Sequence, residues 1–392
     1  MQRAGARARL QPPLSLYVHI PWCVRKCPYC DFNSHAIAPG MELPEREYLD
    51  ALRADLESAL PSVWGRTVHS VFLGGGTPSL LSGAAVESLL SDVRALLPLA
   101  ADCEITLEAN PGTYETGRYA DFRRAGVNRL SIGVQSFADE KLRALGRVHD
   151  AAQALRAVEA AATTFDNFNL DLMIGLPGQT AADAQRDLAQ ALQFSPPHLS
   201  VYQLTLEPNT VFHKTPPPGL PQEQELAQIQ EIAEGCIASA GYEHYEISAH
   251  CRPGRAARHN LNYWTFGDYL GIGAGAHAKL TLPDRILRQE RARLPASYLA
   301  QAAQGRFVAA ERRLSAPDLC FEFMLNALRL RAGFEETLFG QRTGLSLAAL
   351  EPALTQAQER GLLLRADGRI GASALGLRFL NDLQAMFLAN PA

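Results

Sequence analysis

Short runs of apolar and β-branched residues alternate with amphipathic helical stretches from about residue 16 to about residue 249. Such alternation is typical of parallel βα units, in which the strands are buried on both faces. Six runs predict strands, namely LYVHI, SVFLGG, EITLEA, RLSIGV, NLDLMIGL and LSVYQLT, which begin at Leu16, Ser70, Glu104, Arg129, Asn169 and Leu199. We therefore expect an α/β fold built on a partial TIM-type (β/α)6 barrel, with ligand-binding residues after the carboxyl ends of the strands.

The sequence changes its character after about residue 310. We expect residues 1–310 to form the barrel, with further strands near Glu243 and Leu270 that extend its sheet. Residues 311–392 are predicted to form an α+β domain whose order of helices and hairpin resembles a winged helix. Asp367-Gly368 is a hairpin signal in this domain. The helices are expected over Pro317–Leu330, Leu347–Arg360 and Ala374–Leu388.

The charge balance argues against a polyanionic partner. The formal net charge is −4 at pH 7, whereas proteins that hold nucleic acid usually present an excess of lysine and arginine. The predicted winged-helix-like domain carries seven Arg, no Lys and eight Asp and Glu residues after residue 314. We therefore expect no nucleic-acid partner, and we interpret the C-terminal domain as an interaction or lid domain.

The N-terminal segment and the cysteines bear on the compartment. Arg3, Arg7 and Arg9 are not followed by an apolar run, and no later stretch approaches the roughly 18 apolar residues of a membrane span. Seven cysteines in 392 residues are too sparse, and odd in number, for a disulfide framework. We expect a cytoplasmic protein with reduced thiols and no integral membrane segment.

Three of these cysteines are clustered immediately after the first predicted strand. Cys23, Cys27 and Cys30 form a C-x3-C-x2-C array. Three close thiolates suit an iron–sulfur cluster in which one iron keeps an open coordination position. The alternative from the residues alone is a structural zinc site that takes His19 or His35 as its fourth ligand.

Further polar and glycine residues follow the next predicted strands. Gly74 to Thr77 form a glycine-rich turn whose backbone can approach a ligand closely, although a plain glycine turn has the same pattern. Glu108, Gln135, Arg147 and Asp171 fall at or just beyond strand ends, where barrel enzymes bind ligands. The structural alternatives for these side chains are helix caps, salt bridges at the barrel mouth and a solvated helix face.

The cysteine array, with aromatic Tyr29 before the third cysteine, resembles the hallmark of the radical SAM superfamily. The strings EANPG, GVQSF, LGRVH and DLMIGLPGQT are similar to segments of its HemN-like branch. The resemblance covers about residues 14–388 and implies a 4Fe–4S cluster on Cys23, Cys27 and Cys30, with S-adenosylmethionine (SAM) at the open iron. It implies SAM contacts from Tyr17, Tyr29, Gly75, Gly76, Thr77, Glu108, Gln135, Arg147, Asp171, Thr205 and Ala276.

Three details separate two relatives within this branch. The coproporphyrinogen III dehydrogenases have a further cysteine two residues after the third, where this chain has Cys30-Asp31-Phe32, and a longer N-terminal segment. CPYCDFNSH and the sequence from His259 to Trp264 resemble the HemW group of haem chaperones, which has an HNxxYW motif. The resemblance makes His259, Tyr263 and Trp264 candidate haem contacts. A hydrogen-bonded loop packed on the barrel is the structural alternative, and His277 is a second haem candidate.

We therefore expect a haem chaperone that binds haem as cargo and passes it to acceptor haem proteins, with the cluster and SAM as cofactors. The rival hypothesis is an oxygen-independent coproporphyrinogen III dehydrogenase, and a third is a radical SAM methyltransferase or tRNA-modifying enzyme. The missing cysteine and the short N-terminal segment disfavour turnover as a dehydrogenase. The sequence does not determine whether SAM is cleaved, whether haem is attached covalently, or whether the chain works as a monomer or a homodimer.

Overall fold

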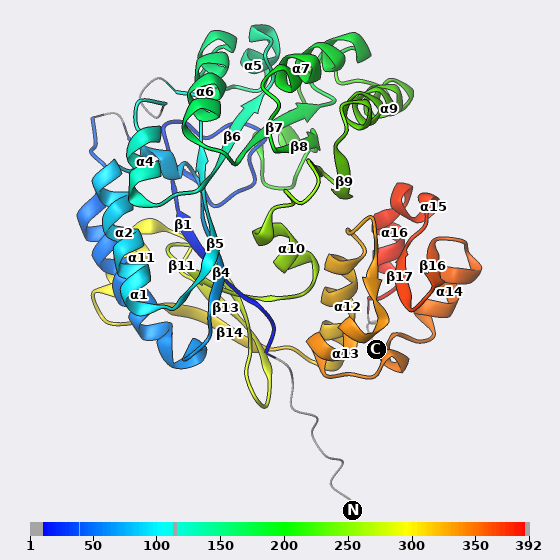
Figure 1. The fold of residues 1–392 in the computed structure, drawn as a ribbon. Helices are drawn as coiled ribbons and strands as arrows, with labels where there is room; N and C mark the ends of the chain where they lie inside the picture. Colours follow the sequence, from blue (N-terminus) through cyan, green and yellow to red (C-terminus); the bar gives the residue numbers. More distant parts are fainter. Residues whose placement is uncertain (1–10, 39, 113–115, 389–392) are drawn as a thin grey trace, which may run out of the picture.

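The computed structural model describes residues 11–38, 40–112 and 116–388, and its centre is a 12-stranded sheet (Figure 1). All six predicted strands are present and pair in sequence order as parallel neighbours, which confirms the partial barrel. They are β1 (Leu14–Ile20), β4 (Val68–Gly75), β5 (Leu99–Ala109), β6 (Arg129–Gln135), β7 (Phe168–Ile174) and β8 (His198–Gln203). Arg3, Arg7 and Arg9, on which the expectation about the N-terminal segment rested, lie outside the described residues. The first residue of the N-terminal domain range and the last residue of the C-terminal one lie outside them too.

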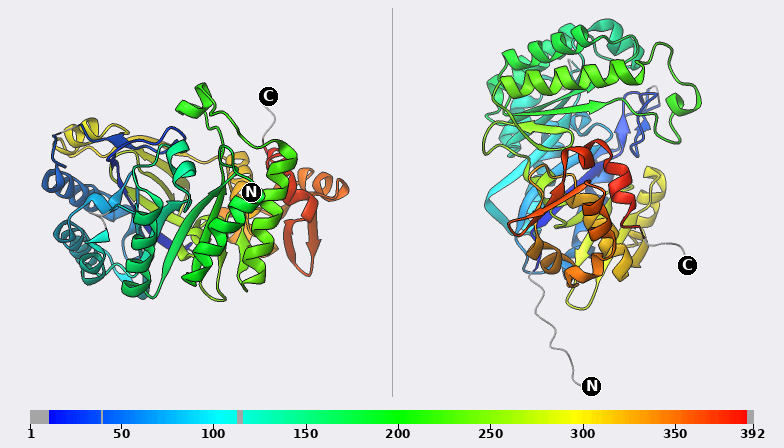
Figure 2. Two further views of the ribbon diagram at one scale, coloured as in Figure 1. Left: turned by 90° about the horizontal axis from the view of Figure 1, so that it is seen from above. Right: turned by 90° about the vertical axis from the view of Figure 1, so that its right-hand side faces the viewer.

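Helices cover the outer face of these strands (Figure 2). Asp150 and Thr180 begin two of them with reciprocal capping boxes, as short polar residues at helix N-termini do. The helices of this layer include α1 (Glu45–Val63), α2 (Gly83–Leu96), α4 (Tyr119–Ala125), α6 (Ala151–Thr164), α7 (Ala181–Gln193) and α9 (Glu223–Ser239). The strands are buried between this layer and the barrel interior, which explains their near-continuous apolar sequence.

The sheet continues beyond both ends of the predicted barrel. On the β1 side, parallel β11 (Asp268–Ile272) is followed by antiparallel β12 (His277–Thr281), β13 (Ile286–Arg291) and β14 (Val308–Arg313). On the β8 side lie β10 (Ala249–Cys251) and β9 (Glu243–Glu246). The predicted extension of the sheet is therefore present. Among the described residues, no helix has both the length and the apolar character needed to cross a bilayer.

The C-terminal part contains the predicted hairpin, β16 (Leu363–Ala366) and β17 (Arg369–Ala372), in a three-stranded sheet with β15 (Phe334–Glu335). Two predicted helices are wrong in extent. Pro352, which has no N–H and a fixed φ, separates η2 (Leu347–Leu350) from α14 (Ala353–Glu359). Phe379, with φ −115° and ψ 43°, separates α15 (Ala374–Arg378) from α16 (Leu380–Ala385). The remaining helices are α12 (Ala316–Ala327) and α13 (Glu336–Thr343).

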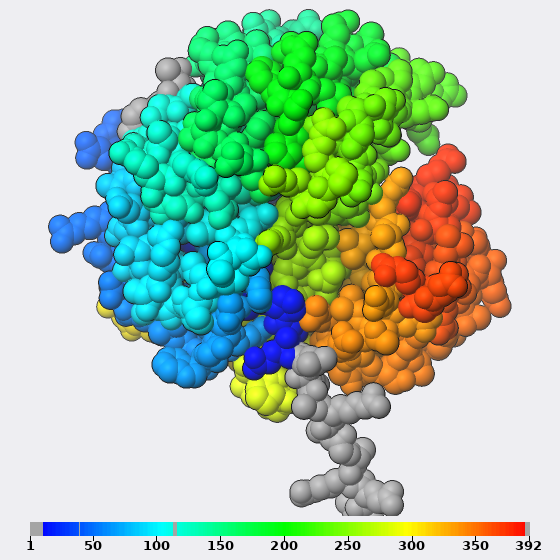
Figure 3. All heavy atoms as spheres, in the orientation of Figure 1, coloured from blue at the N-terminus to red at the C-terminus, as the bar shows by residue number. Residues whose placement is uncertain are grey.

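The C-terminal part packs closely against the barrel (Figure 3). Phe266, which follows α10 (Arg258–Trp264), meets Phe323 of α12 edge to face at 5.7 Å between ring centroids. Two ion pairs cross the same boundary: Arg288 to Glu322 at 2.6 Å and Arg329 to Glu246 at 3.3 Å. The division at residues 310 and 311 stays a prediction, since Phe266 and the C-terminal residues share one apolar cluster.

A buried ion network closes the bottom of the barrel next to β1. Asp268 on β11 accepts hydrogen bonds from Arg66 at 2.7 Å and from Lys279 at 2.8 Å. The backbone and hydroxyl of Thr281 donate to the same carboxylate, both at 2.8 Å. Burial alone would raise the pKa of Asp268, but Lys279 and Arg66 hold it below its ordinary value. The carboxylate is therefore ionised, and it compensates two buried cations.

Replacing Asp268 with alanine leaves Arg66 and Lys279 buried without their counter-charge. We expect the free energy of unfolding of Asp268→Ala to fall by about 3–5 kcal/mol, as measured by urea denaturation of the cluster-free protein. Asp284→Ala is the control because Asp284 is exposed and pairs only with its exposed neighbour Arg285; it should leave stability unchanged. Equal stabilities of the two variants would contradict the structural role of the network.

Candidate functional site

A cavity of about 330 Å³ opens at the carboxyl ends of the parallel strands. This edge is where barrels collect ligand-binding groups, because the ends of all parallel strands meet there. The cavity is also bounded by the loop that carries the cysteine array. The structure brings together most of the predicted site residues on its wall, namely Cys23, Cys27, Tyr29, Cys30, Gly75, Gly76, Thr77, Glu108, Gln135, Arg147, Asp171 and Thr205.

The cysteine loop is fixed at both ends. The short strands β2 (Trp22–Cys23) and β3 (His35–Ala36) pair in parallel, so the chain leaves and returns at the same place. Each sulfur has a polar neighbour. Thr77 Oγ1 donates to Cys23 Sγ at 3.3 Å, Arg147 Nη1 donates to Cys27 Sγ at 3.7 Å, and Cys30 Sγ is hydrogen-bonded to Ser34 Oγ at 3.6 Å. Burial raises the pKa of the Cys23 thiol, and the hydrogen bond from Thr77 offsets only part of this effect. A bound metal would supply the positive charge that stabilises the thiolate, the form that binds metal.

The surroundings of the cysteines fit an iron–sulfur cluster better than zinc. Both ring nitrogens of His19 are occupied, by Tyr17 Oη and by the Asn33 carbonyl, each at 2.9 Å. His35 Nε2 is hydrogen-bonded to Asn33 Oδ1 at 3.3 Å. No three histidine, cysteine or acidic side chains of the described residues converge on a point that could hold one metal ion. A cluster does not need such convergence, because each thiolate binds a different iron.

The glycine turn after β4 packs directly against the cysteine loop. A Cβ on Gly76 would lie 2.5 Å from the Trp22 carbonyl oxygen, and one on Gly75 would lie 2.6 Å from the His19 ring. Gly75 also has a φ of +116°, which residues with a Cβ rarely adopt. Close packing therefore requires these glycines independently of any ligand, and the plain-turn alternative is part of the explanation.

The carboxyl groups of Glu108 and Asp171 lie on the wall of the cavity. Glu108 Oε2 accepts a hydrogen bond from the Gly75 N–H at 3.0 Å. Asp171 accepts hydrogen bonds from Ser131 at 3.2 Å and from Asn169 at 2.8 Å. Burial, and secondly the Asp171 charge, raise the pKa of Glu108 from 4.5 to about 8. Glu108 is therefore protonated at neutral pH in the ligand-free protein, although part of its side chain faces the cavity.

Arg147 is the cation nearest to the cysteines. Besides Cys27, its guanidinium donates to the Gly133 carbonyl at 2.9 Å and to Asn110 Oδ1. Its Nε has no hydrogen-bond partner although it is buried. A fixed cation at the cavity wall is suited to a carboxylate ligand. The structural alternative for Arg147, a solvated helix face, is therefore wrong, because its guanidinium is enclosed at the cavity wall.

The remaining predicted residues lie off this cavity. Tyr17 lines an adjoining cavity of about 430 Å³. Ala276 is buried, and both its backbone N–H and its carbonyl are bonded within the protein, to Gly273 and Arg291. His259 and Trp264 line neither cavity. The roles of all these residues stay predictions, but the geometry gives Ala276 no direct access to a ligand in the main cavity.

Sequence reasoning missed several residues of the cavity wall. Asn110 donates to Thr77 Oγ1 at 2.9 Å and accepts from Arg147, so it connects the glycine turn to the cation. It follows Ala109 at the end of β5, and this position in the EANPG string is the signal that could have identified it. The other missed residues of the wall include Arg25, Ser131, Tyr202, Gln203 and Glu207.

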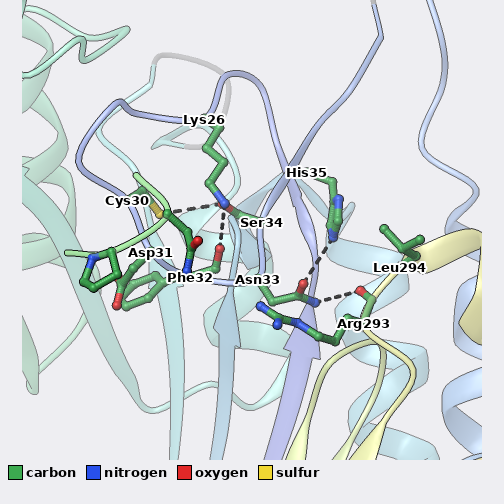
Figure 4. A pocket seen from close by; sticks show the side chains of 11 residues that line it. Lys26, Cys30, Asp31, Phe32, Asn33, Ser34, His35, Arg293 and Leu294 are labelled. Atoms are coloured by element: carbon green, nitrogen blue, oxygen red, sulfur yellow. Dashed lines mark hydrogen bonds between the residues drawn. The ribbon is translucent and has the colours of Figure 1, made fainter. Parts of the chain in front are cut away.

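Besides the main cavity and the adjoining one, a third cavity of about 410 Å³ lies on the other side of the cysteine loop (Figure 4). Lys26 donates to the Phe32 carbonyl at 2.8 Å, and Asn33 donates to the Arg293 carbonyl at 2.9 Å (Figure 4). Asn33 also donates to the Ala274 carbonyl at 3.0 Å. The cysteine loop is thus attached to segments almost 250 residues away in sequence, as well as to its own ends.

Comparison with known proteins agrees with this geometry. Residues 17–191 match the radical SAM superfamily, and residues 314–379 match the HemN C-terminal domain. The structure of coproporphyrinogen III oxidase (HemN) from Escherichia coli is similar, with a TM-score of 0.80 and 25% identity over 97% of this chain and 91% of that one. The fold and the site define a radical SAM protein with a HemN-type C-terminal domain.

Relatives that match nearly the whole chain narrow this class. Heme chaperone HemW of Escherichia coli (strain K12) is 50% identical over 96% of this chain and 99% of its own length. HemW of Bacillus subtilis (strain 168) is 33% identical over 95% and 99%. The mitochondrial radical S-adenosyl methionine domain-containing protein 1 of Bos taurus is 34% identical over 96% and 87%. The chain belongs to the HemW family, and its superfamily implies a 4Fe–4S cluster and SAM.

The raised pKa of Glu108 makes stability depend on pH. Between about pH 4.5 and pH 8 the unfolded chain releases this proton while the folded protein keeps it. The free energy of unfolding of the cluster-free wild type should therefore fall with rising pH relative to Glu108→Gln, by at most about 1.4 kcal/mol per pH unit. Urea denaturation across this range measures the difference. A constant difference would mean that Glu108 titrates normally in the folded protein.

Proposed function

We propose that this chain is a haem chaperone that binds haem, one molecule per chain, and passes it to acceptor haem proteins. The observation that carries the proposal is the match to heme chaperone HemW over 99% of the length of that protein at 50% identity. The HNxxYW sequence from His259 to Trp264 and the CPYCDFNSH sequence support it.

We further propose that Cys23, Cys27 and Cys30 hold the 4Fe–4S cluster and that the main cavity holds SAM. The cluster, when bound, supplies an open iron position for SAM next to the glycine turn. The chain contributes Arg147 as the fixed cation for a carboxylate, and Thr77 and Arg147 as hydrogen-bond donors to the sulfurs. Tyr29, Gln135, Asp171 and Thr205 complete the wall, where their polar groups are available to ribose and adenine.

Coproporphyrinogen III dehydrogenase is the less favoured function despite the similar fold of HemN. Phe32 stands where those dehydrogenases have their further cysteine, and its side chain is 59% exposed. It lies on the walls of both the main cavity and the adjoining one. An apolar ring at this place supplies neither a thiol nor a proton donor.

The proposed setting is the cytoplasm. All seven cysteines are unpaired, which suits a reducing compartment. The proposed partners are haem and an acceptor haem protein.

Haem titration of the anaerobically reconstituted protein tests the function directly. We expect a saturable shift of the haem absorption band at about one haem per chain, because a defined site binds one porphyrin. The loaded protein should then transfer haem to an apo haem protein, as seen by the recovery of its spectrum. Light scattering of the same samples measures the molar mass and so distinguishes a monomer from a homodimer.

The same preparation is then incubated with SAM, a low-potential reductant and coproporphyrinogen III. We expect no protoporphyrin-type product by mass analysis. Stoichiometric decarboxylation would replace the chaperone proposal with a dehydrogenase. A haem titration without saturation would remove the chaperone proposal.

The cluster assignment predicts the effect of single cysteine changes. Cys23→Ser, Cys27→Ser and Cys30→Ser should each lose most of the iron, sulfide and cluster absorbance, because each thiol supplies one of only three protein ligands. Cys236→Ser is the matched control, since Cys236 is a half-buried residue of α9 away from the cavity. A single array variant with unchanged iron, sulfide and spectrum would refute the assignment.

A further inference from the structure

A second cavity, of about 430 Å³, adjoins the proposed SAM site. The two cavities share Phe32, Gly75 and Glu108 as wall residues. Residues of α10, β11, β12 and β13 line this second cavity. Its other lining residues include Tyr17, Tyr263, Tyr269, His277, Glu290 and Arg293. Its volume is in the range of ordinary cofactor pockets.

One wall of this second cavity presents aromatic rings. Tyr263 and Tyr269 stack with 4.2 Å between their centroids at an interplanar angle of 26°. Tyr269 is held in place by Arg288, which donates to its hydroxyl and is itself paired with Glu322 at 2.6 Å. Tyr269 is only 8% exposed, so the ring of Tyr263 supplies the open apolar surface of this wall, and Tyr269 is packed against it. A ring fixed in this way offers an apolar surface to a flat macrocycle without losing side-chain freedom on binding.

His259 is poorly placed to reach iron in either cavity. Its side chain is 7% exposed and stacks on Phe72 at 4.4 Å between ring centroids. Tyr17 lies at 6.2 Å on a nearly parallel plane. Burial lowers the pKa of His259 to about 3, so the ring is neutral and part of the core. An iron atom could approach it only if this stack opened.

His277, in contrast, is the accessible imidazole of the second cavity. It is the first residue of β12, its side chain is 57% exposed, and its direct cross-strand neighbour on β13 is Glu290. His277 Nδ1 lies 4.0 Å from Glu290 Oε1. A carboxylate that accepts a hydrogen bond from one ring nitrogen orients metal-binding histidines, because it fixes the tautomer and leaves Nε2 for the metal. At 4.0 Å the two groups are beyond hydrogen-bond distance in the haem-free protein, so Glu290 takes this role only after a small movement of the two exposed side chains.

The rim of the second cavity carries an additional positive charge. Arg293 follows β13 and is exposed; it lines the third cavity (Figure 4) and also the second cavity. Its guanidinium is suited to a carboxylate at the edge of a bound ligand. The aromatic wall, the accessible imidazole of His277 and the Arg293 cation at the rim together match a metalloporphyrin with propionate side chains. The porphyrin supplies the other iron ligands, so a single histidine from the chain is enough.

We propose that the second cavity is the seat of haem, with His277 as the axial iron ligand, Glu290 as its positioning residue, and the stacked Tyr263 and Tyr269 as the platform for the ring. The proposal rests on the proposed function, in which haem is the cargo. It also places haem beside SAM, with Phe32, Gly75 and Glu108 between them. An edge of the porphyrin remains open to solvent next to Arg293, where an acceptor protein can reach it.

The test is a ferric haem titration of the reconstituted full-length protein, followed by absorbance and electron paramagnetic resonance. His277→Ala should lose the axial-imidazole signature and bind haem at least about 10-fold more weakly. Added imidazole should restore the signature in this variant, which a purely structural role would not allow. Glu290→Gln should keep the signature but bind a few-fold more weakly. His69→Ala is the matched control, because His69 is exposed on β4 and lines neither cavity; it should behave as wild type.

His259→Phe separates the two histidines because it keeps an aromatic ring on Phe72. Loss of the signature in this variant, with retention in His277→Ala, would overturn the proposed seat while leaving the chaperone function intact. A wild-type spectrum in His277→Ala would overturn it in the same way. A wild-type protein without saturable haem binding would instead remove the proposed function, and the seat with it.

Discussion

The close approach of β1 and β4 at their carboxyl ends is the constraint on which the site depends. The strands stay in register from Ser15 opposite Ser70 to Ile20 opposite Gly75, and the Gly76 N–H then donates to the Ile20 carbonyl at 2.7 Å. Only a residue without a side chain fits at Gly76, since the Trp22 carbonyl lies where a Cβ would be. This contact sets the first cysteine above the glycine turn, within reach of Thr77. The position of the cysteine loop therefore follows from backbone packing, before any cluster or ligand is bound.

Much of the main cavity could be predicted from sequence because its residues obey a local rule. Glu108 and Gln135 lie at the carboxyl ends of β5 and β6, and parallel strands bring those ends to one edge of the sheet. Asp171 was also expected at a strand end, but it is the middle residue of β7. The strands themselves were predictable because burial on both faces demands continuous apolar runs. The protonation state of Glu108 could not be predicted from sequence, because its pKa depends on burial and on Asp171, which is more than 60 residues away in sequence.

What sequence reasoning could not determine depends partly on contacts between distant segments and partly on the backbone of single residues. Nothing near Ala276 indicates that the turn after β11 is enclosed by the cysteine loop, where Asn33 reaches across to Ala274. The helix expected over Leu347–Arg360 has a helical pattern on both sides of Pro352, and the break reflects the backbone of one residue. The accessible surface of a histidine is likewise a property of its neighbours, so His259 and His277 could not be ranked from sequence.

The HNxxYW sequence serves chiefly to connect three parts of the molecule. His259 packs on Phe72 of β4, and Trp264 lies under the guanidinium of Arg329 at 4.3 Å, which reaches it from the C-terminal domain. Asn262, between them, donates to Ser15 Oγ on β1 at 2.9 Å and to the Asp268 carbonyl at 2.7 Å. These contacts fix α10 (Figure 1) and leave one motif side chain, Tyr263, on a cavity wall. These packing contacts account for the motif residues in the haem-free protein, and the proposed haem seat uses only Tyr263 among them.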